Sequence, residues 1–446
     1  MQVSVSTGSG VTQSKSGGSI FPSGKMLAFV LVTVIFFLWG MSNNLTDILQ
    51  QQFKKSFELS VLQANLVSVA VFLAYGLMAI PAAQFMRKLG YKAGILTGLM
   101  VFTTGIVLFL PAAFVGKYGL FLLALFIAGS GQSILETACN PFIAEFGPDD
   151  TSERRLNFSQ AFNPPGTIFG VLVGTVFIFS GVEKTPAQVL AMKAAGTYAA
   201  YLHSETTRVV PTYLGFAAAL LILTVLIWRT PFPMMNSEQG IQNEGGGIGF
   251  SLLGKYPHLL FAVVAQFFYV GAQVATWSNF ILYMRTYTTQ PERACGYFLT
   301  GSLIALGIGR VFSTWLLRYV AAPKLMRVYA LINICLVLLA VIRPGMMGAM
   351  GLVATSFFMS IMFPTIFALG VKGLGADTKV GGSLIVTSIV GGAVFPFFLG
   401  LIARTTGNLA LGYAIPAIGY VVVAIYGFVG ASWGVTERDV EAAPLV

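Results

Sequence analysis

Two acidic residues, Asp47 and Glu136, lie well inside long apolar segments of this chain, and their chemistry is the most informative feature of the sequence. A carboxylate near the centre of a bilayer costs about 2.5 to 3.5 kcal/mol on insertion scales, so it usually marks a polar cavity, an ion path or a proton relay. Two such residues predict a protein that moves a substance across a membrane.

Amides accompany Asp47 on one face of its helix. Asn43 and Asn44 precede it by four and three residues, and this spacing places the three side chains on one side of a helix. The pattern predicts a cavity that offers amides and a carboxylate to a hydrophilic ligand. The alternative is that these residues cap the outer end of the helix, although Leu45 and the apolar residues after Asp47 continue the apolar pattern.

Glu136 lies on a polar helical face with Gln132 four residues before it and Asn140 four residues after it. Such a face is costly in a membrane unless it is solvated or paired. Arg310 is the one cation well inside another apolar segment, so a structural ion pair with Glu136 is the alternative interpretation. The two interpretations are compatible, because an interhelical pair that breaks and re-forms would serve as a gate.

Further amides and aromatic rings follow helical spacing in two other segments. Amides both donate and accept hydrogen bonds, which suits sugar hydroxyls, and an aromatic face can stack on the C–H groups of a pyranose. Polar contacts between helices and simple packing are the alternatives. The candidate residues are Asn157, Gln160 and Asn163 before the kinking Pro164-Pro165-Gly166 segment, and the stripe Gln266, Tyr269, Gln273 and Trp277.

Composition predicts an all-α integral membrane protein, because 56% of the 446 residues are hydrophobic and only 9% are charged. Apolar runs of about 20 residues match helices of bilayer length and exclude the weaker alternating pattern of a β-barrel. We expect twelve spans, at 26–52, 61–86, 92–113, 117–146, 157–181, 211–230, 256–286, 294–319, 325–343, 346–371, 380–404 and 409–433.

The stretch 231–249 contains Pro, Asn, Gln and consecutive glycines and divides the spans into six and six. The predicted domains are a disordered cytoplasmic tail (1–25), a six-helix bundle (26–230), a cytoplasmic linker (231–255), a second bundle (256–433) and a short cytoplasmic tail (434–446). Internal similarity supports a duplication: the run at 36–40 resembles that at 267–271, and a proline precedes a glycine by six residues at 141 and at 364. Duplicated halves with a site between them are typical of secondary transporters.

Basic residues in short loops predict that both termini are cytoplasmic in a plasma membrane, here expected to be a bacterial inner membrane. The net charge of +10 fits retention at the anionic leaflet and does not indicate nucleic-acid binding. Three scattered cysteines and two histidines give no metal site, and no phosphate-binding GxxxxGK[ST] motif is present. We therefore expect no cofactor, no ATP hydrolysis and no enzyme activity, and we expect a monomer.

Five runs carry a family resemblance. They are FFLWGMSNNLTDIL (36–49), LETACNPF (135–142), RLNFSQAFNPPG (155–166), AQFFYVGAQVATWSNFI (265–281) and MFPTIFALGVKGLGADTKVGGS (362–383), and they resemble the fucose-permease-like sugar symporters of the major facilitator superfamily. The resemblance extends over residues 26–433, apart from the central linker.

This resemblance implies a proton-coupled sugar symporter with two pseudo-symmetric six-helix bundles and alternating access. It ties Asp47 to proton coupling and Glu136 to both substrate and proton, and it places Gln160, Asn163 and Asn44 at sugar-contacting positions. Fucose permeases have a tyrosine where this chain has Phe363, so glucose, galactose, mannose, fructose or N-acetylglucosamine are alternatives to L-fucose. Sodium coupling and a non-transporting sugar sensor on the same fold remain the competing functions.

Overall fold

The structure, a computed structural model, describes residues 26–57, 61–148, 151–178, 186–233, 235 and 249–430. The described residues form helices and no strand, in agreement with the predicted all-α class. Both predicted tails and residues 234 and 236–248 of the predicted linker lie outside these ranges, so the predicted domain boundaries stay predictions.

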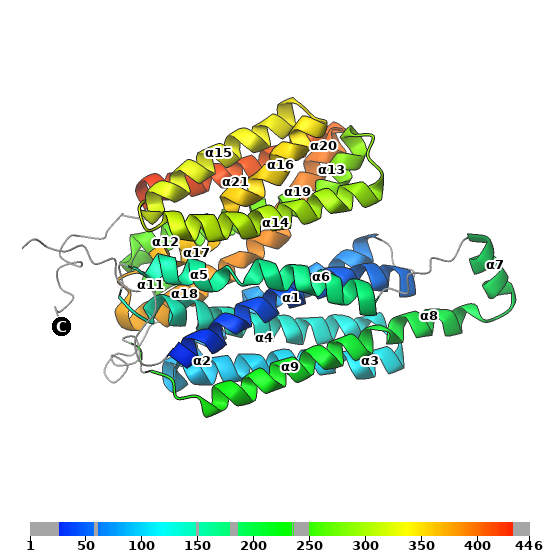
Figure 1. Cartoon of the computed structure of the whole chain (residues 1–446), viewed down its shortest axis with the longest axis horizontal. Helices are drawn as coiled ribbons and strands as arrows, with labels where there is room; N and C mark the ends of the chain where they lie inside the picture. Colours follow the sequence, from blue (N-terminus) through cyan, green and yellow to red (C-terminus); the bar gives the residue numbers. More distant parts are fainter. Residues whose placement is uncertain are drawn as a thin grey trace, which may run out of the picture.

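The described residues of the first half of the chain form nine helices (Figure 1). In chain order they are α1 (Met26–Ser56), α2 (Val61–Val107), α3 (Phe109–Val115), α4 (Tyr118–Glu145), α5 (Ser152–Gln160), α6 (Asn163–Phe177), α7 (Pro186–Ala194), α8 (Tyr198–Thr207) and α9 (Val209–Arg229).

The second half contains a similar succession of long and broken helices. In chain order they are α11 (Ser251–Lys255), α12 (Pro257–Ser278), α13 (Phe280–Tyr287), α14 (Glu292–Leu316), α15 (Ala322–Ile342), α16 (Met346–Met359), α17 (Met362–Val371), η2 (Gly375–Asp377), α18 (Thr378–Thr387), η3 (Ser388–Val390), α19 (Gly391–Thr406), α20 (Leu409–Gly412), α21 (Ala414–Ile425) and η4 (Tyr426–Gly430).

Ten helical segments among the described residues are long and apolar enough to cross a membrane. The second predicted span and most of the third fall in α2, in which Gly90 makes the turn with a positive φ of 82° that glycine tolerates, and the third span ends in α3. The fifth predicted span is divided between α5 and α6, each shorter than 18 residues. The structure is therefore consistent with twelve crossings.

The helices form two bundles that lie side by side (Figure 1). Helices α14, α15, α16 and α21 belong to the upper bundle, α1 to α6 with α8 and α9 form the lower one, and α7 projects beyond it at the right. Between the bundles, α18 contacts α2 and α4, α17 contacts α4 and α5, and α14 contacts α5 and α6. These contacts bring the polar segments of both halves to one interface.

Each bundle contains a helix crossing that only glycine permits. A Cβ on Gly166 of α6 would overlap the carbonyl oxygen of Phe37 in α1, and one on Gly391 of α19 would overlap the carbonyl oxygen of Phe267 in α12. Small residues let helix backbones approach closely in membranes, where dispersion contacts drive association. The shared arrangement supports the internal duplication that the sequence indicates.

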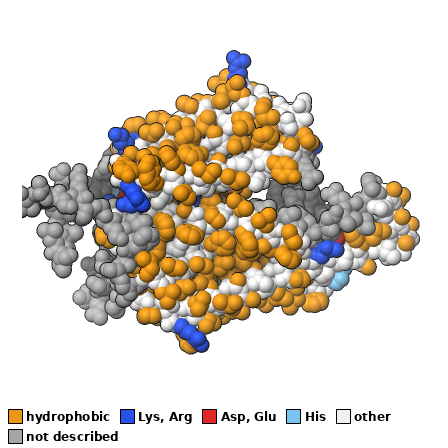
Figure 2. All heavy atoms as spheres, viewed as in Figure 1, with side chains coloured by type: hydrophobic (Ala, Val, Ile, Leu, Met, Phe, Trp, Pro, Cys, Tyr) orange, Lys and Arg blue, Asp and Glu red, His pale blue; other side chains and the backbone are white. Residues whose placement is uncertain are grey.

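The outer surface has the composition expected for a protein surrounded by lipid. In the view of Figure 2, hydrophobic side chains cover most of the face across both bundles, and the visible Lys and Arg side chains lie toward its margins. Many large apolar side chains are exposed, among them Ile222, Ile308 and Trp315. In water such a surface would be unfavourable, whereas in hydrocarbon it is not.

Candidate functional site

A polar face of α4 forms the centre of the candidate site. Gln132, Glu136 and Asn140 follow one another at four-residue steps, and their exposed fractions are 6%, 1% and 0%. The Gln132 amide donates to the Ser42 hydroxyl of α1 at 3.0 Å, and the Asn140 amide donates to Glu136 Oε1 at 3.5 Å. The helical spacing seen in the sequence thus puts the carboxylate between two buried amides.

Gln160 at the end of α5 extends this polar face to a second helix. Its Nε2 donates to Asn140 Oδ1 at 2.9 Å, and the side chain is 5% exposed. Glu136, Asn140 and Gln160 therefore form one chain of polar contacts across α4 and α5. The sequence indicates each residue separately, and the structure brings the three together.

The Glu136 carboxylate is only partly satisfied in this conformation. Its Oε2 has no hydrogen bond within the described residues, and no Lys or Arg in that part of the chain lies within ion-pair distance of it. Tyr75 of α2 lies close enough to interact electrostatically with the carboxylate, and Trp39 of α1 lies next to Tyr75. Sequence reasoning missed Tyr75, because a single tyrosine among apolar residues gives no signal.

Arg310 of α14 connects the two bundles through backbone carbonyls. Its Nη1 donates to the Gln160 carbonyl oxygen at 2.8 Å, and its Nε donates to the Ser360 carbonyl oxygen at 2.8 Å. The guanidinium is 5% exposed and does not pair with Glu136 in this conformation. The proposed gating pair between Glu136 and Arg310 stays a prediction for another conformation.

The candidates on α1 and α6 are only partly described. Asn43 is exposed on α1, whereas the side chains of Asn44 and Asp47 lie outside the described part of the structure. Asn163 opens α6, and its amide donates to the Phe36 carbonyl oxygen of α1 at 3.3 Å. Asn163 is therefore tied to the α1–α6 crossing, while the predicted role of Asp47 stays a prediction.

The stripe on α12 makes several contacts inside its own bundle. The Tyr269 hydroxyl donates to the Met359 carbonyl oxygen at 3.1 Å, and Trp277 Nε1 donates to the Ser356 hydroxyl at 3.1 Å. Gln266 is fully buried, and neither of its amide atoms has a hydrogen bond within the described residues. Hydrogen bonds within the bundle thus account for Tyr269 and Trp277 here. Gln273 is half-buried and has no side-chain hydrogen bond to any other described residue.

Phe363 lies in α17, a different helix from the one that carries this stripe. Its ring is half-buried, and its centroid lies 6.5 Å from that of Tyr269 in an edge-to-face arrangement. Phe363 is therefore close to an aromatic side chain of α12.

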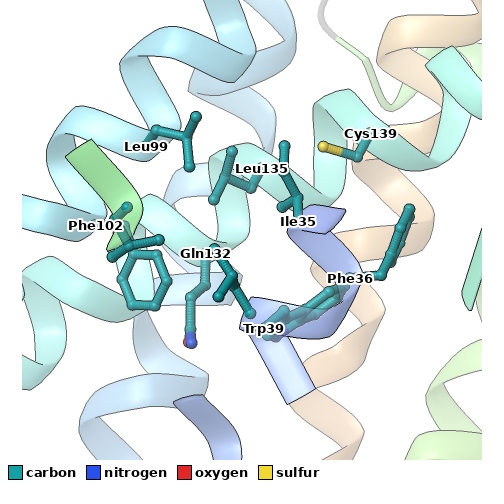
Figure 3. Close-up of a pocket in the computed structure, with 10 residues that line it drawn as sticks. Ile35, Phe36, Trp39, Leu99, Phe102, Gln132, Leu135 and Cys139 are labelled. Atoms are coloured by element: carbon teal, nitrogen blue, oxygen red, sulfur yellow. The ribbon is translucent and has the colours of Figure 1, made fainter. Parts of the chain in front are cut away.

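A small enclosed cavity lies inside the first bundle, next to the α4 face (Figure 3). Its volume is about 10 Å³, which is room for about one water molecule. Ile35 and Trp39 of α1 face Leu135 and Gln132 of α4 across it. The cavity is too small for any ligand larger than water.

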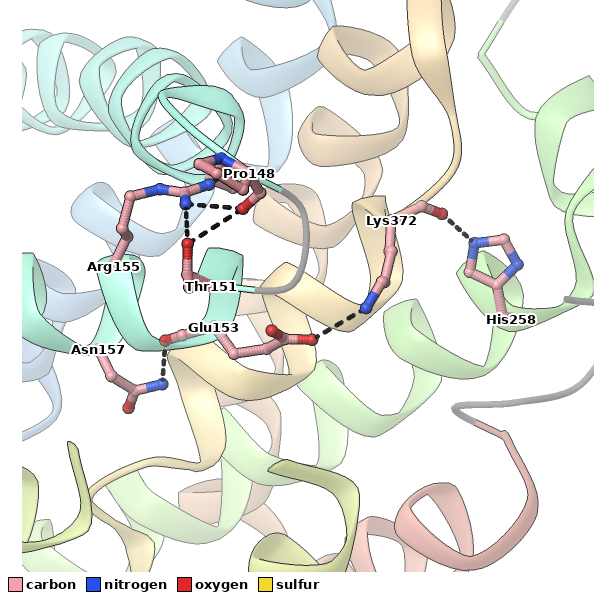
Figure 4. Close-up of polar contacts among 8 residues, drawn as sticks. Pro148, Thr151, Glu153, Arg155, Asn157, His258 and Lys372 are labelled. Atoms are coloured by element: carbon pink, nitrogen blue, oxygen red, sulfur yellow. Dashed lines mark hydrogen bonds and ion pairs between the residues drawn. The ribbon is translucent and has the colours of Figure 1, made fainter. Parts of the chain in front are cut away.

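One end of the bundle interface is closed by contacts between the two halves (Figure 4). Lys372 Nζ, after α17, lies 3.6 Å from Glu153 Oε1 in α5, and the Lys372 carbonyl oxygen lies 3.0 Å from His258 Nε2 in α12. The Asn157 amide of α5 also donates to the Thr365 hydroxyl of α17 at 3.3 Å. We call Glu153, Lys372, Asn157 and Thr365 the interbundle latch.

Arg155 fixes the helix that carries half of this latch (Figure 4). The buried guanidinium donates to the carbonyl oxygens of Ile143, Pro148 and Gly147 at 3.2, 2.8 and 3.2 Å and to the Thr151 hydroxyl at 2.6 Å. It thereby satisfies carbonyls that α4 leaves unpaired at its end. In the sequence, Arg155 indicated only the orientation of the chain in the membrane.

Two helical bundles, an apolar outer surface and buried polar residues at their interface define a membrane transporter of the major facilitator type. A family model of the Major Facilitator Superfamily matches residues 28–396. The chain belongs to this superfamily, and it is therefore a multi-pass membrane transporter and not an enzyme. Among the described residues, no group of three or more His, Cys, Asp or Glu side chains could hold a metal ion.

Comparisons with individual proteins narrow this class. The chain is 40% identical over 406 residues to the L-fucose-proton symporter of Escherichia coli (strain K12). The aligned residues cover 90% of this chain and 92% of that protein. It is 32% identical over 412 residues to a glucose/galactose transporter of Brucella abortus biovar 1 (strain 9-941). This alignment covers 91% of this chain and 94% of that protein. A crystal structure of the transporter FucP in the outward conformation matches with a TM-score of 0.82 at 39% identity, covering 90% of this chain and 97% of that one.

Proposed function

We propose that this chain is a secondary active transporter that carries a neutral monosaccharide together with a proton by alternating access. The observation that carries the proposal is the buried carboxylate of Glu136, which lacks a cationic partner in the described residues and contacts the amide of Asn140. The names of the relatives, a fucose-proton symporter and a glucose/galactose transporter, support the same class of substrate.

In this proposal a proton neutralises Glu136 and removes the cost of a buried charge, which permits sugar to bind and the bundles to move. The amides of Asn140 and Gln160 exchange their mutual hydrogen bond for bonds to sugar hydroxyls. Asp47 shares the coupling role. The further candidates for sugar contact are Asn43, Asn44, Asn163, Gln266, Tyr269, Gln273, Trp277 and Phe363.

Alternating access requires the interbundle latch to open on one side of the membrane. In the structure the latch joins α5 to α17, and Arg310 joins α14 to Gln160 deeper in the interface. We propose that this conformation is closed on the side of the latch and that the opposite side opens to admit sugar. Release then breaks the Glu153–Lys372 and Arg310–Gln160 contacts, and Arg310 becomes free to pair with Glu136.

We further propose that the latch faces the cytoplasm, that both termini lie on that side, and that the protein acts as a monomer in a bacterial inner membrane. Basic loop residues on the latch side support the orientation. Residues 26–230 and 256–433 form the two moving bundles in this scheme, and 231–255 link them on the cytoplasmic side.

The choice of sugar depends on Phe363, which presents no hydroxyl beside Tyr269. We expect hexoses such as glucose, galactose or mannose, or an amino sugar, to be preferred over L-fucose. Phe363→Tyr should increase L-fucose transport relative to glucose, because it supplies a donor and acceptor that the wild-type ring lacks. Competition of unlabelled sugars against one labelled substrate measures this ratio, and an unchanged ratio would remove Phe363 from the specificity site.

The decisive experiment records external pH after each candidate sugar is added to lightly buffered, deenergised proteoliposomes, with and without sodium. Proton symport predicts sugar-triggered alkalinisation that persists without sodium. Sodium-dependent uptake without a pH change would show that Na⁺, and not the proton, is the coupling ion. The assignment of the sugar substrate would then still hold. Binding of sugar without any uptake would instead indicate a sensor.

Two variants assign the coupling residues. Asp47→Asn and Glu136→Gln should each abolish the pH change and concentrative uptake, while Asp47→Asn keeps at least part of the sugar exchange. Glu205→Gln serves as the control, because Glu205 of α8 is buried but pairs at 3.5 Å with Arg208, the residue that follows α8. Full concentrative uptake by either test variant would exclude that residue from coupling.

A further inference from the structure

An apolar groove lies between the bundles, on the outer, lipid-facing side of α6 and α14. Its volume is about 740 Å³, within the range of about 300 to 1,000 Å³ typical of ligand pockets. One wall comes from Ala161 and α6, the other from α14, and the principal lining residues are Pro164, Pro165, Ile168, Ile304, Ile308 and Trp315. All ten residues that line it are apolar.

The groove is open to the surface that hydrocarbon surrounds. Ile308 is 60% exposed and Val311 is 64% exposed on the α14 wall. In Figure 1, α14 lies beside α5 and α6 on the face that Figure 2 shows to be mainly hydrophobic. A cavity of this size and lining, inside a membrane, excludes water and takes up the apolar groups of its surroundings.

The dimensions of the groove match one leaflet. Ile304 and Trp315 are eleven residues apart on α14, which corresponds to about 16 Å along a helix. This is close to half of the hydrocarbon thickness of about 30 Å. The groove therefore has the length of a single acyl chain that extends from the interface to the midplane.

The outer end of the groove carries the groups that hold lipid headgroups. Trp315 is 49% exposed, and tryptophan prefers the membrane interface. Arg318 follows it by three residues, is exposed, and is the second residue after the end of α14. A guanidinium at this depth attracts the phosphate of an anionic lipid.

We propose that this groove is a binding site for one acyl chain of an anionic phospholipid, whose headgroup is held at Arg318. The site has one wall on each bundle, so a bound chain contacts both parts that move during transport. The proposal requires only that the protein is embedded in a membrane, and it does not depend on the sugar or the coupling ion.

The test uses the full-length protein in vesicles of phosphatidylcholine and phosphatidylglycerol that contain a small fraction of phospholipid with a diazirine on its acyl chain. After irradiation, labelled peptides are mapped by mass spectrometry. Labelling should be concentrated at residues 161–168 and 304–315 compared with equally exposed apolar positions elsewhere. Labelling in proportion to exposure over the whole surface, or cross-links between two copies at the groove, would overturn the proposal.

Three substitutions make the test specific. Ile308→Trp fills the groove and should reduce labelling there, whereas Ile222→Trp places the same side chain on α9 at a position of similar exposure (63%) and should leave it unchanged. Arg318→Gln should weaken the preference for the anionic over the zwitterionic probe about fivefold, as expected for one basic residue at a membrane surface. An unchanged headgroup preference in Arg318→Gln would refute the assignment of the headgroup.

Discussion

Breaking the Glu153–Lys372 pair should shift the protein toward the conformation that is open on the latch side. Two unit charges 3.6 Å apart attract by about 4.6 kcal/mol at an effective dielectric constant of about 20. The Lys372 side chain is 42% exposed, so solvent screening reduces the net contribution to about 1 kcal/mol. This corresponds to about a fivefold change in the conformational equilibrium.

The pair can be separated from its surroundings by a double-mutant cycle. Glu153→Gln and Lys372→Met should each produce the fivefold shift, and the double variant should produce no more than either single variant. The bond between His258 and Lys372 uses the Lys372 backbone carbonyl, so neither substitution removes it. Glu205→Gln breaks an ion pair within one bundle and should leave the conformational equilibrium unchanged.

Distances between spin labels at residues 88 and 324 measure the equilibrium. Both positions carry exposed lysines near the latch end of different bundles, and replacement of the exposed Cys335 prevents unwanted labelling there. Each single variant should populate a longer distance. Equal distance distributions in wild type and both single variants, or additive shifts in the double variant, would refute the role of this pair in closing the interface.

Two further predictions concern stability, measured by thermal unfolding of the purified protein in detergent. Gly166→Ala should destabilise the protein by about 1 to 3 kcal/mol, because the added Cβ would meet a backbone oxygen of α1. Gly215 has open space around it, so Gly215→Ala should be neutral or stabilising. Equal stabilities of the two variants would contradict the close helix crossing at Gly166. Gln160→Leu should destabilise the protein by about 1 to 3 kcal/mol, because it leaves Asn140 Oδ1 unpaired. Gln266→Leu should be neutral or stabilising, because the buried Gln266 amide has no partner in the described residues. A larger loss of stability in Gln266→Leu than in Gln160→Leu would contradict this account.

Local periodicity explains what could be predicted about the site. Residues four apart in a helix share a face whatever the rest of the fold does, so the proximity of Glu136 and Asn140 follows from the sequence alone. The interruption between α5 and α6 is equally local, because Pro164 and Pro165 cannot donate the hydrogen bonds that would continue α5, whereas proline is tolerated in the first turn of α6. Local spacing does not predict which residues of other helices these side chains contact.

The partner of Arg310 illustrates that limit. Sequence reasoning considered Glu136 as its counterion, yet the guanidinium donates to two carbonyl oxygens, one of them on Gln160. Backbone acceptors carry no sequence signal, since every residue has one. The latch contact between Glu153 and Lys372 was also not predicted, because both residues resembled ordinary charges at loop ends.

The sequence by itself determined that this chain is a helical membrane protein with duplicated halves and two acids in apolar surroundings. Hydrophobic length and composition decide this, because the bilayer requires every spanning backbone to satisfy its own hydrogen bonds. Only the tertiary structure decided that Gln160 meets Asn140, that Tyr269 and Trp277 bond within their own bundle, and that one end of the interface is closed. Those pairings depend on how helices distant in the chain pack against each other, and packing is a property of the whole molecule.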